Sequence, residues 1–175
     1  MYRAMEGFST QTVPLPAGDR GTRKTVAAMR TLADRGSRDL AVRAAVIRAL
    51  GASGAAPHNI PAQVRAWFEY VKNGIFFLHD PVATEWLQSP RYTLASGAGD
   101  CDDRATLLAA GLKSFGVPAS FKAVAVDPRR PRSFSHVYVV ANVMGRAIAL
   151  DPTYDDNAMG DEPQTRMFRT WMVPA

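Results

Sequence analysis

The stretch SGAGDCDDRATLLAAGLKSFGVPASFKAVAV, residues 96–126, contains the change of periodicity on which the expected fold depends. Over residues 101–115 the apolar side chains recur every three or four positions, which predicts a helix with a buried face. Gly116 and Pro118 end this helix, because both residues are typical of helix C-termini. Over residues 120–126 polar and apolar side chains tend to alternate, which predicts a strand.

Two further strands and a hairpin turn are predicted downstream of this stretch. Residues 135–140 are rich in β-branched and aromatic side chains, and residues 146–150 form a second run that ends at an Asp-Pro pair. The turn at 142–145 joins them. Upstream, helical spacing predicts three helices, at residues 22–33, 40–50 and 61–72. Helices followed by an antiparallel meander indicate an α+β fold in which the helices pack on an antiparallel β-sheet.

The chain is 175 residues long, which is the size of one domain. Its composition nevertheless suggests a division into an N-terminal region and a main core. Residues 1–20 carry two prolines and little periodicity, and we expect them to form an extended arm. The small-residue segment 51–57 is a predicted connection, and residues 75–90 are expected to be loop. We therefore expect an N-terminal arm and Arg-rich helical region at 1–58, and the main core at 59–175.

The formal net charge of +5 is unevenly distributed along the chain. Residues 19–48 contain eight basic and three acidic side chains, whereas residues 151–162 contain five acidic and no basic ones. A basic segment is typical of binding to nucleic acid or an acidic partner, but no aromatic residues or recognition-helix motif accompany this one. We therefore favour a solvated helix face and treat nucleic-acid binding as the disfavoured alternative.

Composition and hydropathy exclude several other classes of protein. With 47% hydrophobic and 21% charged residues, the chain has an average globular composition rather than a disordered, collagen-like or coiled-coil one. The first residues are not followed by the apolar stretch of a secretory signal, and no run reaches the ~18 apolar residues of a membrane span. The sequence therefore predicts no membrane association and a cytoplasmic location, where a free thiol stays reduced.

The sequence contains one cysteine, Cys101, which excludes an internal disulfide and a four-cysteine metal site. A lone cysteine is either a small buried hydrophobe or a nucleophile. Cys101 begins the predicted helix directly after residues 97–100, of which the small residues 97–99 would leave room for a substrate backbone. The helix N-terminus lowers the pKa of a thiol, whereas the neighbouring Asp100, Asp102 and Asp103 would raise it.

His136 and Asp151 are placed to complete a nucleophilic site with Cys101. His136 lies at the start of one predicted strand, and Asp151 follows the next strand. Because the turn at 142–145 makes these strands antiparallel neighbours, we expect Asp151 near His136, where a carboxylate would orient the imidazole. The imidazole would in turn pair with the thiol and protonate a leaving group. Each residue alone has an ordinary structural explanation, and their joint placement favours a catalytic one.

Three motifs of this sequence together resemble the transglutaminase-like superfamily of papain-like folds, and in particular its small bacterial and phage-encoded members: GDCDDRA at 99–105, FSHVY at 134–138 and LDPT at 150–153. The resemblance extends over residues 60–155 and implies a transglutaminase-like catalytic core at 59–175, with the nucleophilic cysteine at a helix N-terminus. It implies that Cys101 is the nucleophile, His136 the general base and Asp151 the residue that orients the histidine. Tyr138 departs from the family pattern, in which many members have Trp.

The resemblance also implies an oxyanion hole. The backbone N–H of Cys101 is the expected first donor, and the side chain of Trp86 or Gln88 is the candidate second donor. No cofactor is predicted, and Cys101, Asp102, His136 and Asp151 have poor spacing for a metal site. The other acidic and histidine residues considered are interpreted as solvated turn or surface positions: Asp155, Asp156, Asp161, Glu162, His58 and His79.

The function implied by the resemblance is cysteine-dependent acyl transfer on a peptide or isopeptide amide through a thioester. Hydrolysis by a cysteine peptidase or amidase is the favoured outcome, and cross-linking to an amine is the alternative. The expected partner is a protein or peptide substrate. The second class considered is a non-catalytic interaction module whose Arg-rich helices bind an acidic partner. A phage origin would imply association with a virion.

Overall fold

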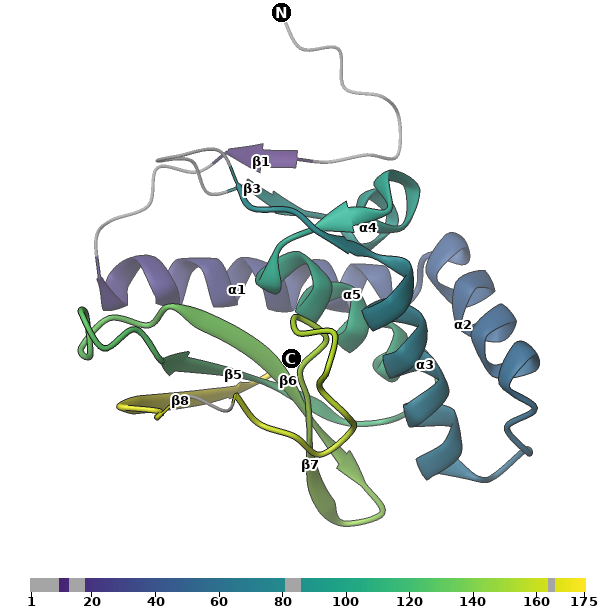
Figure 1. Ribbon diagram of the computed structural model, residues 1–175. Coiled ribbons are helices and arrows are strands. Elements are labelled where there is room, and N and C mark those ends of the chain that lie inside the picture. Colours follow the sequence, from purple (N-terminus) through teal and green to yellow (C-terminus); the bar gives the residue numbers. More distant parts are fainter. Residues whose placement is uncertain (1–9, 13–17, 81–85, 164–165) are drawn as a thin grey trace, which may run out of the picture.

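The structure is a computed structural model, and it describes residues 10–12, 18–80, 86–163 and 166–175 (Figure 1). The helices are α1 (Asp19–Gly36), α2 (Leu40–Ser53), α3 (Ile60–Gly74), α4 (Pro90–Ser96) and α5 (Cys101–Ser114). The strands are β1 (Thr10–Thr12), β2 (Phe76–Phe77), β3 (Trp86–Gln88), β4 (Ala98–Gly99), β5 (Ala119–Ala125), β6 (His136–Val143), β7 (Arg146–Leu150) and β8 (Arg169–Pro174). This arrangement confirms the predicted α+β fold.

The main sheet has four antiparallel strands in the order β7-β6-β5-β8. The predicted meander supplies three of them, and the hairpin between β6 and β7 turns at Met144 and Gly145. Both residues have positive φ angles, 53° and 83°, which suit the right-handed twist of a two-residue hairpin. The fourth strand, β8, comes from the C-terminal end of the described chain and pairs with β5 at the opposite edge.

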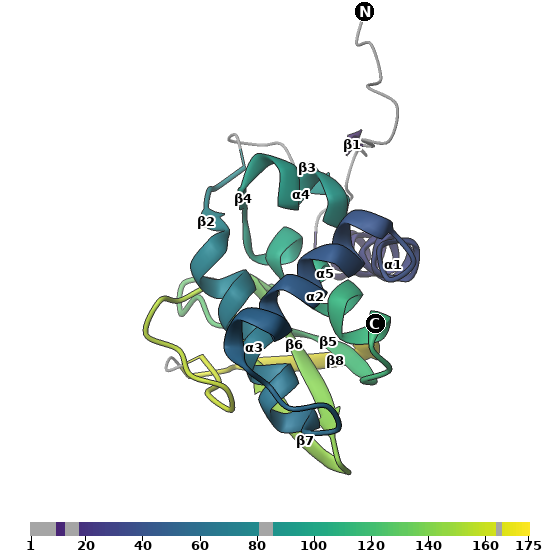
Figure 2. The ribbon, with the colours of Figure 1, turned by 90° about the vertical axis from the view of Figure 1, so that its right-hand side faces the viewer.

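Helix α5 lies at the centre of the molecule, between the other helices and the sheet (Figures 1 and 2). Its residues from Asp102 to Leu112 are all buried, so this helix is buried on every side and not only on the one face that its periodicity predicted. The indole of Trp67 on α3 packs against Gly111, and its Nε1–H donates a hydrogen bond of 3.0 Å to the carbonyl of Leu108. The cysteine at the start of this helix is therefore held by the most buried element of the fold.

The N-terminal helices share one hydrophobic core with the rest of the chain. Met29 from α1 and Val42 from α2 are fully buried in the same cluster as Trp67 and Leu108. The division into two regions at residue 58 stays a prediction. All eight basic side chains of residues 19–48 are exposed, as expected of a solvated helix face. Within the described ranges, no helix has the length and apolar character needed to span a bilayer.

Several elements differ from the sequence prediction. Helix α2 continues through Gly51 to Ser53, and its N-cap is Asp39, whose carboxylate accepts a 2.7 Å hydrogen bond from the N–H of Ala41. The predicted loop at 75–90 contains β2 and β3, and α4 begins at its end. These strands have two or three residues, too few to show a period, and form because β2 pairs with β4 and β3 with β1. Most of the predicted arm lies outside the described residues.

Candidate active site

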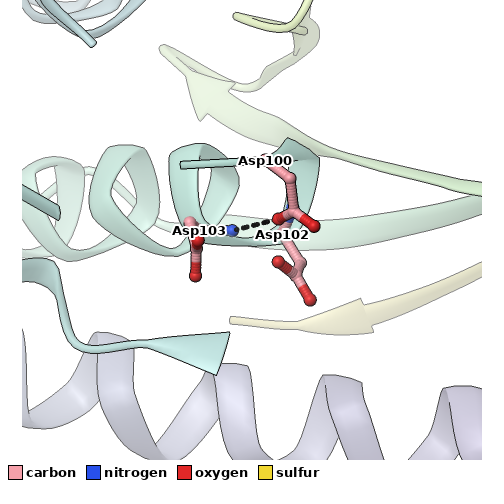
Figure 3. A group of neighbouring side chains, drawn as sticks. All are labelled: Asp100, Asp102 and Asp103. Atoms are coloured by element: carbon pink, nitrogen blue, oxygen red, sulfur yellow. Dashed lines mark hydrogen bonds between the residues drawn. The ribbon is translucent and has the colours of Figure 1, made fainter. Parts of the chain in front are cut away.

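The first turn of α5 positions Cys101. Asp100 is the N-cap of this helix, and its Oδ1 accepts hydrogen bonds from the backbone N–H groups of Asp102, at 3.2 Å, and Asp103, at 3.5 Å (Figure 3). Cys101 is the first helical residue and is half-buried. Its own N–H belongs to the first turn, where backbone donors have no partner inside the helix.

The surroundings of Cys101 favour the neutral thiol. Burial raises the pKa of Cys101 well above its ordinary value, and the carboxylates of Asp102 and Asp100 raise the pKa further. The backbone N–H of Val137 donates a hydrogen bond to the sulfur and opposes this increase only in part. Burial and the acidic neighbours thus act in the same direction, and both raise the pKa of the Cys101 thiol.

His136 and Asp151 are joined by a buried hydrogen bond. Strands β6 and β7 pair with Val139 opposite Leu150, which brings the first residue of β6 beside the residue that follows β7. His136 Nε2 and Asp151 Oδ2 are 2.8 Å apart, and the side chains are 5% and 0% exposed. Because Asp151 occupies Nε2, the imidazole keeps Nδ1 for a second partner.

Two tyrosine rings hold the imidazole of His136 in place. Tyr138, two residues along the same face of β6, stacks at a centroid distance of 5.9 Å, and Tyr154 lies at 5.6 Å. The Tyr138 hydroxyl donates a 2.9 Å hydrogen bond to Glu162, which also pairs with Lys122. Glu162 was predicted to be a solvated turn residue; its side chain is 39% exposed, but its carboxylate also anchors the ring beside His136, which the sequence did not predict.

Cys101 and His136 line the same cavity, whose volume is about 820 Å³. Asp151 lies behind His136 and is not part of the lining. The wall of the cavity comes from the first half of α1, from Phe77 and His79, from the start of α5, from β5 and β6, and from the loop after β7. The structure therefore brings the predicted nucleophile and base to one opening, with the predicted orienting residue in contact with the base.

The structure does not bring Trp86 or Gln88 to this cavity, whose described lining contains neither residue. The backbone N–H of Trp86 is directed to Asp80, and that of Gln88 donates a 2.6 Å hydrogen bond to Asp103. The side chain of Gln88 accepts a hydrogen bond from Ser96. The second donor of the oxyanion hole therefore stays a prediction without support from these contacts.

Other residues line the cavity although the sequence did not predict them as site residues, because long-range contacts bring them there. His79, interpreted as a surface residue, lines the cavity, and so do Asp155 and Asp156, which are also exposed as expected. Gly99 was expected to leave room for substrate, but a Cβ there would lie 2.7 Å from the Cβ of Asp103. The space beside Gly99 is therefore taken by a side chain of the protein itself.

Arg104 connects the site to two other elements. It is 1% exposed, and its guanidinium donates hydrogen bonds to the carbonyls of Lys72, at 2.6 Å, and Thr153, at 3.3 Å. Lys72 lies in the last turn of α3, where backbone carbonyls lack helical partners. Thr153 follows Asp151, so Arg104 fixes the loop that carries the partner of His136.

Asp100, Asp102 and Asp103 are close enough together to be examined as a metal site. One carboxylate oxygen of each lies within 4.8 Å of the others (Figure 3). However, Asp100 is occupied as the helix N-cap, and Asp103 accepts the hydrogen bond from Gln88. Burial and the nearby charge of Asp100 raise the pKa of Asp103 to about 8, so it is mainly protonated at neutral pH and binds a cation poorly. Helix capping thus explains the position of Asp100, and attachment of the Gln88 segment explains that of Asp103.

The family model of the transglutaminase-like superfamily matches residues 46–152, and the chain belongs to this superfamily. Cys101, His136 and Asp151 all lie within the match, whereas α1 and β8 lie outside it. No curated protein matches the chain. The α+β fold with the cysteine at the N-terminus of α5 is thus the fold of a known superfamily.

Solved structures with a similar fold include two proteins of larger size. A "putative cysteine protease" from Cytophaga hutchinsonii is 19% identical with a TM-score of 0.49, and the match covers 74% of this chain and 50% of that chain. A "putative protease" from Parabacteroides distasonis is 20% identical with a TM-score of 0.52, and the match covers 73% of this chain and 26% of that chain. The matched part thus spans half or less of each of these proteins, and the second likeness supports the fold alone.

Proposed function

We propose that the protein catalyses acyl transfer from a peptide or isopeptide amide, with Cys101 as nucleophile, His136 as general base and acid, and Asp151 as the residue that orients the imidazole. The observation that carries this proposal is the 2.8 Å hydrogen bond between His136 and Asp151, at a cavity that Cys101 also lines. A buried carboxylate on one imidazole nitrogen fixes the tautomer that presents the other nitrogen as a base.

The reaction begins with a proton transfer, because burial and the carboxylates of Asp102 and Asp100 favour the neutral thiol of Cys101. His136 Nδ1 accepts the proton of Cys101 as the sulfur attacks the substrate carbonyl carbon. The carbonyl oxygen becomes an oxyanion, for which the N–H of Cys101 is the proposed donor. The imidazolium then protonates the leaving amine, the C–N bond breaks, and a thioester on Cys101 remains.

The thioester is released by a second nucleophile. His136 removes a proton from a water molecule, which attacks the thioester carbon, and the returning proton restores the thiol as the carboxylic acid leaves. A primary amine in place of water would give a cross-linked amide. Hydrolysis is the proposed outcome, supported by the resemblance to small members of the superfamily and by the protease description of the Parabacteroides distasonis relative.

The test is a peptide digest of a proteome, incubated with the protein and followed by mass spectrometry in water enriched in heavy oxygen. Wild type should produce new C-termini that carry one heavy oxygen, and Cys101→Ala should produce none. His136→Asn should reduce turnover by about a hundredfold or more. The matched control is His58→Asn, which changes an exposed histidine in a loop and should leave turnover unchanged.

The products decide between the alternatives. New amide bonds to an added primary amine, without labelled C-termini, would replace hydrolysis by cross-linking. Identical peptide patterns for wild type and Cys101→Ala, with no product of either kind, would overturn the catalytic proposal altogether.

A further inference from the structure

We propose that the cavity beside Cys101 selects substrates that carry a positive charge close to the reacting carbonyl, such as peptides with Lys or Arg at that position. The inference rests on the proposed function for the statement that a substrate enters the cavity. The sign of the substrate's charge follows from the side chains that line it.

The described lining of the cavity is acidic, although the protein as a whole is basic. Four carboxylates line it, those of Asp100, Asp102, Asp155 and Asp156, and no Lys or Arg is among the lining residues that the structure describes. The whole sequence has 21 Lys and Arg residues and a net charge of +5. The local charge is therefore opposite in sign to the average, and a cation is attracted there.

The acidic residues flank the nucleophile from two sides. Asp100 and Asp102 precede and follow Cys101 on the first turn of α5. Asp155 and Asp156 lie on the loop after β7, which the Asn157 amide fixes by a 3.2 Å hydrogen bond to the carbonyl of Asp151. The helix that carries Cys101 and the loop after β7 therefore both contribute carboxylates to the lining of the cavity.

Helix α1 directs its basic residues away from the cavity. Its lining residues include Gly21, Thr22, Val26 and Met29, which share one face at helical spacing. The neighbouring basic side chains of α1, at positions 20, 23, 24 and 30, are exposed and outside the lining. The helix therefore contributes an uncharged wall, and its positive charge does not offset the carboxylates at close range.

The buried cation Arg104 is not among the described lining residues either. Arg104 interacts electrostatically with Asp155 and Asp151, but it is 1% exposed and donates hydrogen bonds to the backbone carbonyls of Lys72 and Thr153. The guanidinium thus supports the loop from behind and is outside the described lining.

Two aromatic rings in the lining are also suited to a cation. Phe77 is 39% exposed and Tyr154 is 43% exposed, and both line the cavity. The face of an aromatic ring attracts an ammonium or guanidinium group by its quadrupole. Carboxylates and aromatic faces together recognise a cationic side chain more selectively than either does alone.

Charge selection would also assist the reaction. Asp100 and Asp102 raise the pKa of the Cys101 thiol, since their negative charge disfavours the thiolate. A cation bound between these carboxylates and the sulfur would cancel part of that effect. A cationic substrate would therefore both bind in the cavity and promote loss of the thiol proton.

The test uses charged thiol reagents, because Cys101 is the single cysteine of the chain and every modification reports on this cavity. The rate of disulfide formation is measured with a trimethylammonium-ethyl thiosulfonate and with a sulfonato-ethyl thiosulfonate. Both reagents consume the same thiolate, so the raised pKa cancels from the ratio of their rates. The normalised cation preference is the ratio of the cationic to the anionic rate at Cys101, divided by the same ratio for a small free thiol. It should be about tenfold or more at low ionic strength and should fall in high salt.

The variant Asp155→Asn/Asp156→Asn should lower this normalised preference by about threefold or more, since two lining charges are removed. The control Asp34→Asn also removes a carboxylate, one that pairs with Lys113 and lies outside the lining, and should leave the preference unchanged. A normalised preference of one or less overturns the proposal, as does a preference that the double variant leaves unchanged. Labelling needs no turnover, so the absence of peptide products would overturn the proposed reaction without altering this result.

Discussion

The two halves of α5 are equally buried but differ in chemistry. In the first half Asp102, Asp103 and Arg104 are between 1% and 5% exposed, although they are ionisable residues. In the second half Leu108 and Leu112 are fully buried among apolar neighbours. Burial of apolar groups stabilises a fold, whereas burial of ionisable groups lowers stability unless each is well partnered.

This difference indicates that the first half of α5 supports the candidate site and that the second half stabilises the core. Side chains of the first half form hydrogen bonds with other segments: Asp103 accepts one from the N–H of Gln88, and Arg104 donates to the carbonyls of Lys72 and Thr153. The second half instead packs directly on α3 through Gly111 and Trp67. One helix therefore anchors the core at one end and orients the loops around the candidate nucleophile at the other.

The largest effect is expected from crowding the second half with Gly111→Ala. A Cβ at Gly111 would lie 2.1 Å from Cε2 of Trp67, which is fully buried and hydrogen-bonded to Leu108 and cannot move aside. We expect the free energy of unfolding to fall by about 3 kcal/mol or more, measured by urea denaturation. In the control Gly51→Ala, on α2, nothing lies within 4 Å of the added Cβ, and stability should rise by about 0.5–1 kcal/mol. Equal stability of Gly111→Ala and wild type would contradict the packing described.

The next largest effect is expected in the first half, from Arg104→Met. The carbonyls of Lys72 and Thr153 would lose a charged donor in a buried setting, which should cost about 2–3 kcal/mol of stability. Because Thr153 follows Asp151, kcat should fall more than KM rises. The control is Arg43→Met, at an exposed position of α2, which should change neither stability nor kcat measurably. If both arginine variants behaved alike, Arg104 would have no positioning role.

The same contrast explains what the sequence could predict. Local patterns were enough to predict helix α5 and strands β5 to β7, because neighbouring residues specify their periodicity. A two-residue turn, also specified locally, was enough to predict the approach of Asp151 to His136. The role of Arg104 depends on carbonyls 32 and 49 residues away, and β8 forms only by pairing with a strand far upstream. No local pattern encodes such pairings, because they arise when the chain has already folded.

Residues of the candidate site divide in the same way. Cys101 and His136 stand out by residue type and by their places at the ends of predicted elements. The acidic lining was not predicted, because Asp155 and Asp156 differ from ordinary turn residues only in facing a cavity that the uncharged side of α1 helps to close. That face of α1 carries small and apolar residues, and such residues are typical of any buried helix face.

A smaller effect is expected from Asp103, whose ionisation should make the stability of the protein depend on pH. Its pKa of about 8 in the folded protein lies above the ordinary 3.8, so between these values the folded protein holds a proton that the unfolded chain has released. Stability should therefore fall as the pH rises across this window. Asp103→Asn, which resembles the protonated acid, should be about 1–2 kcal/mol more stable than wild type at the upper end of the window and similar at the lower end. Parallel curves for the two proteins in urea denaturation across this window would show that Asp103 is ionised throughout.

The smallest effect is expected from Asp102→Asn, which should shift the pKa of the Cys101 thiol. Alkylation by the neutral reagent iodoacetamide follows the thiolate fraction, so its rate at Cys101 should be low at neutral pH and rise until well into the alkaline range. Asp102→Asn should move this profile to lower pH by about half a unit, because one charge that disfavours the thiolate is removed. Asp34→Asn, a loss of equal charge from the far end of α1, should leave the profile in place. A wild-type midpoint at or below that of a free thiol would mean that the helix N-terminus outweighs the acidic residues, and that the first half of α5 activates the sulfur before any substrate arrives.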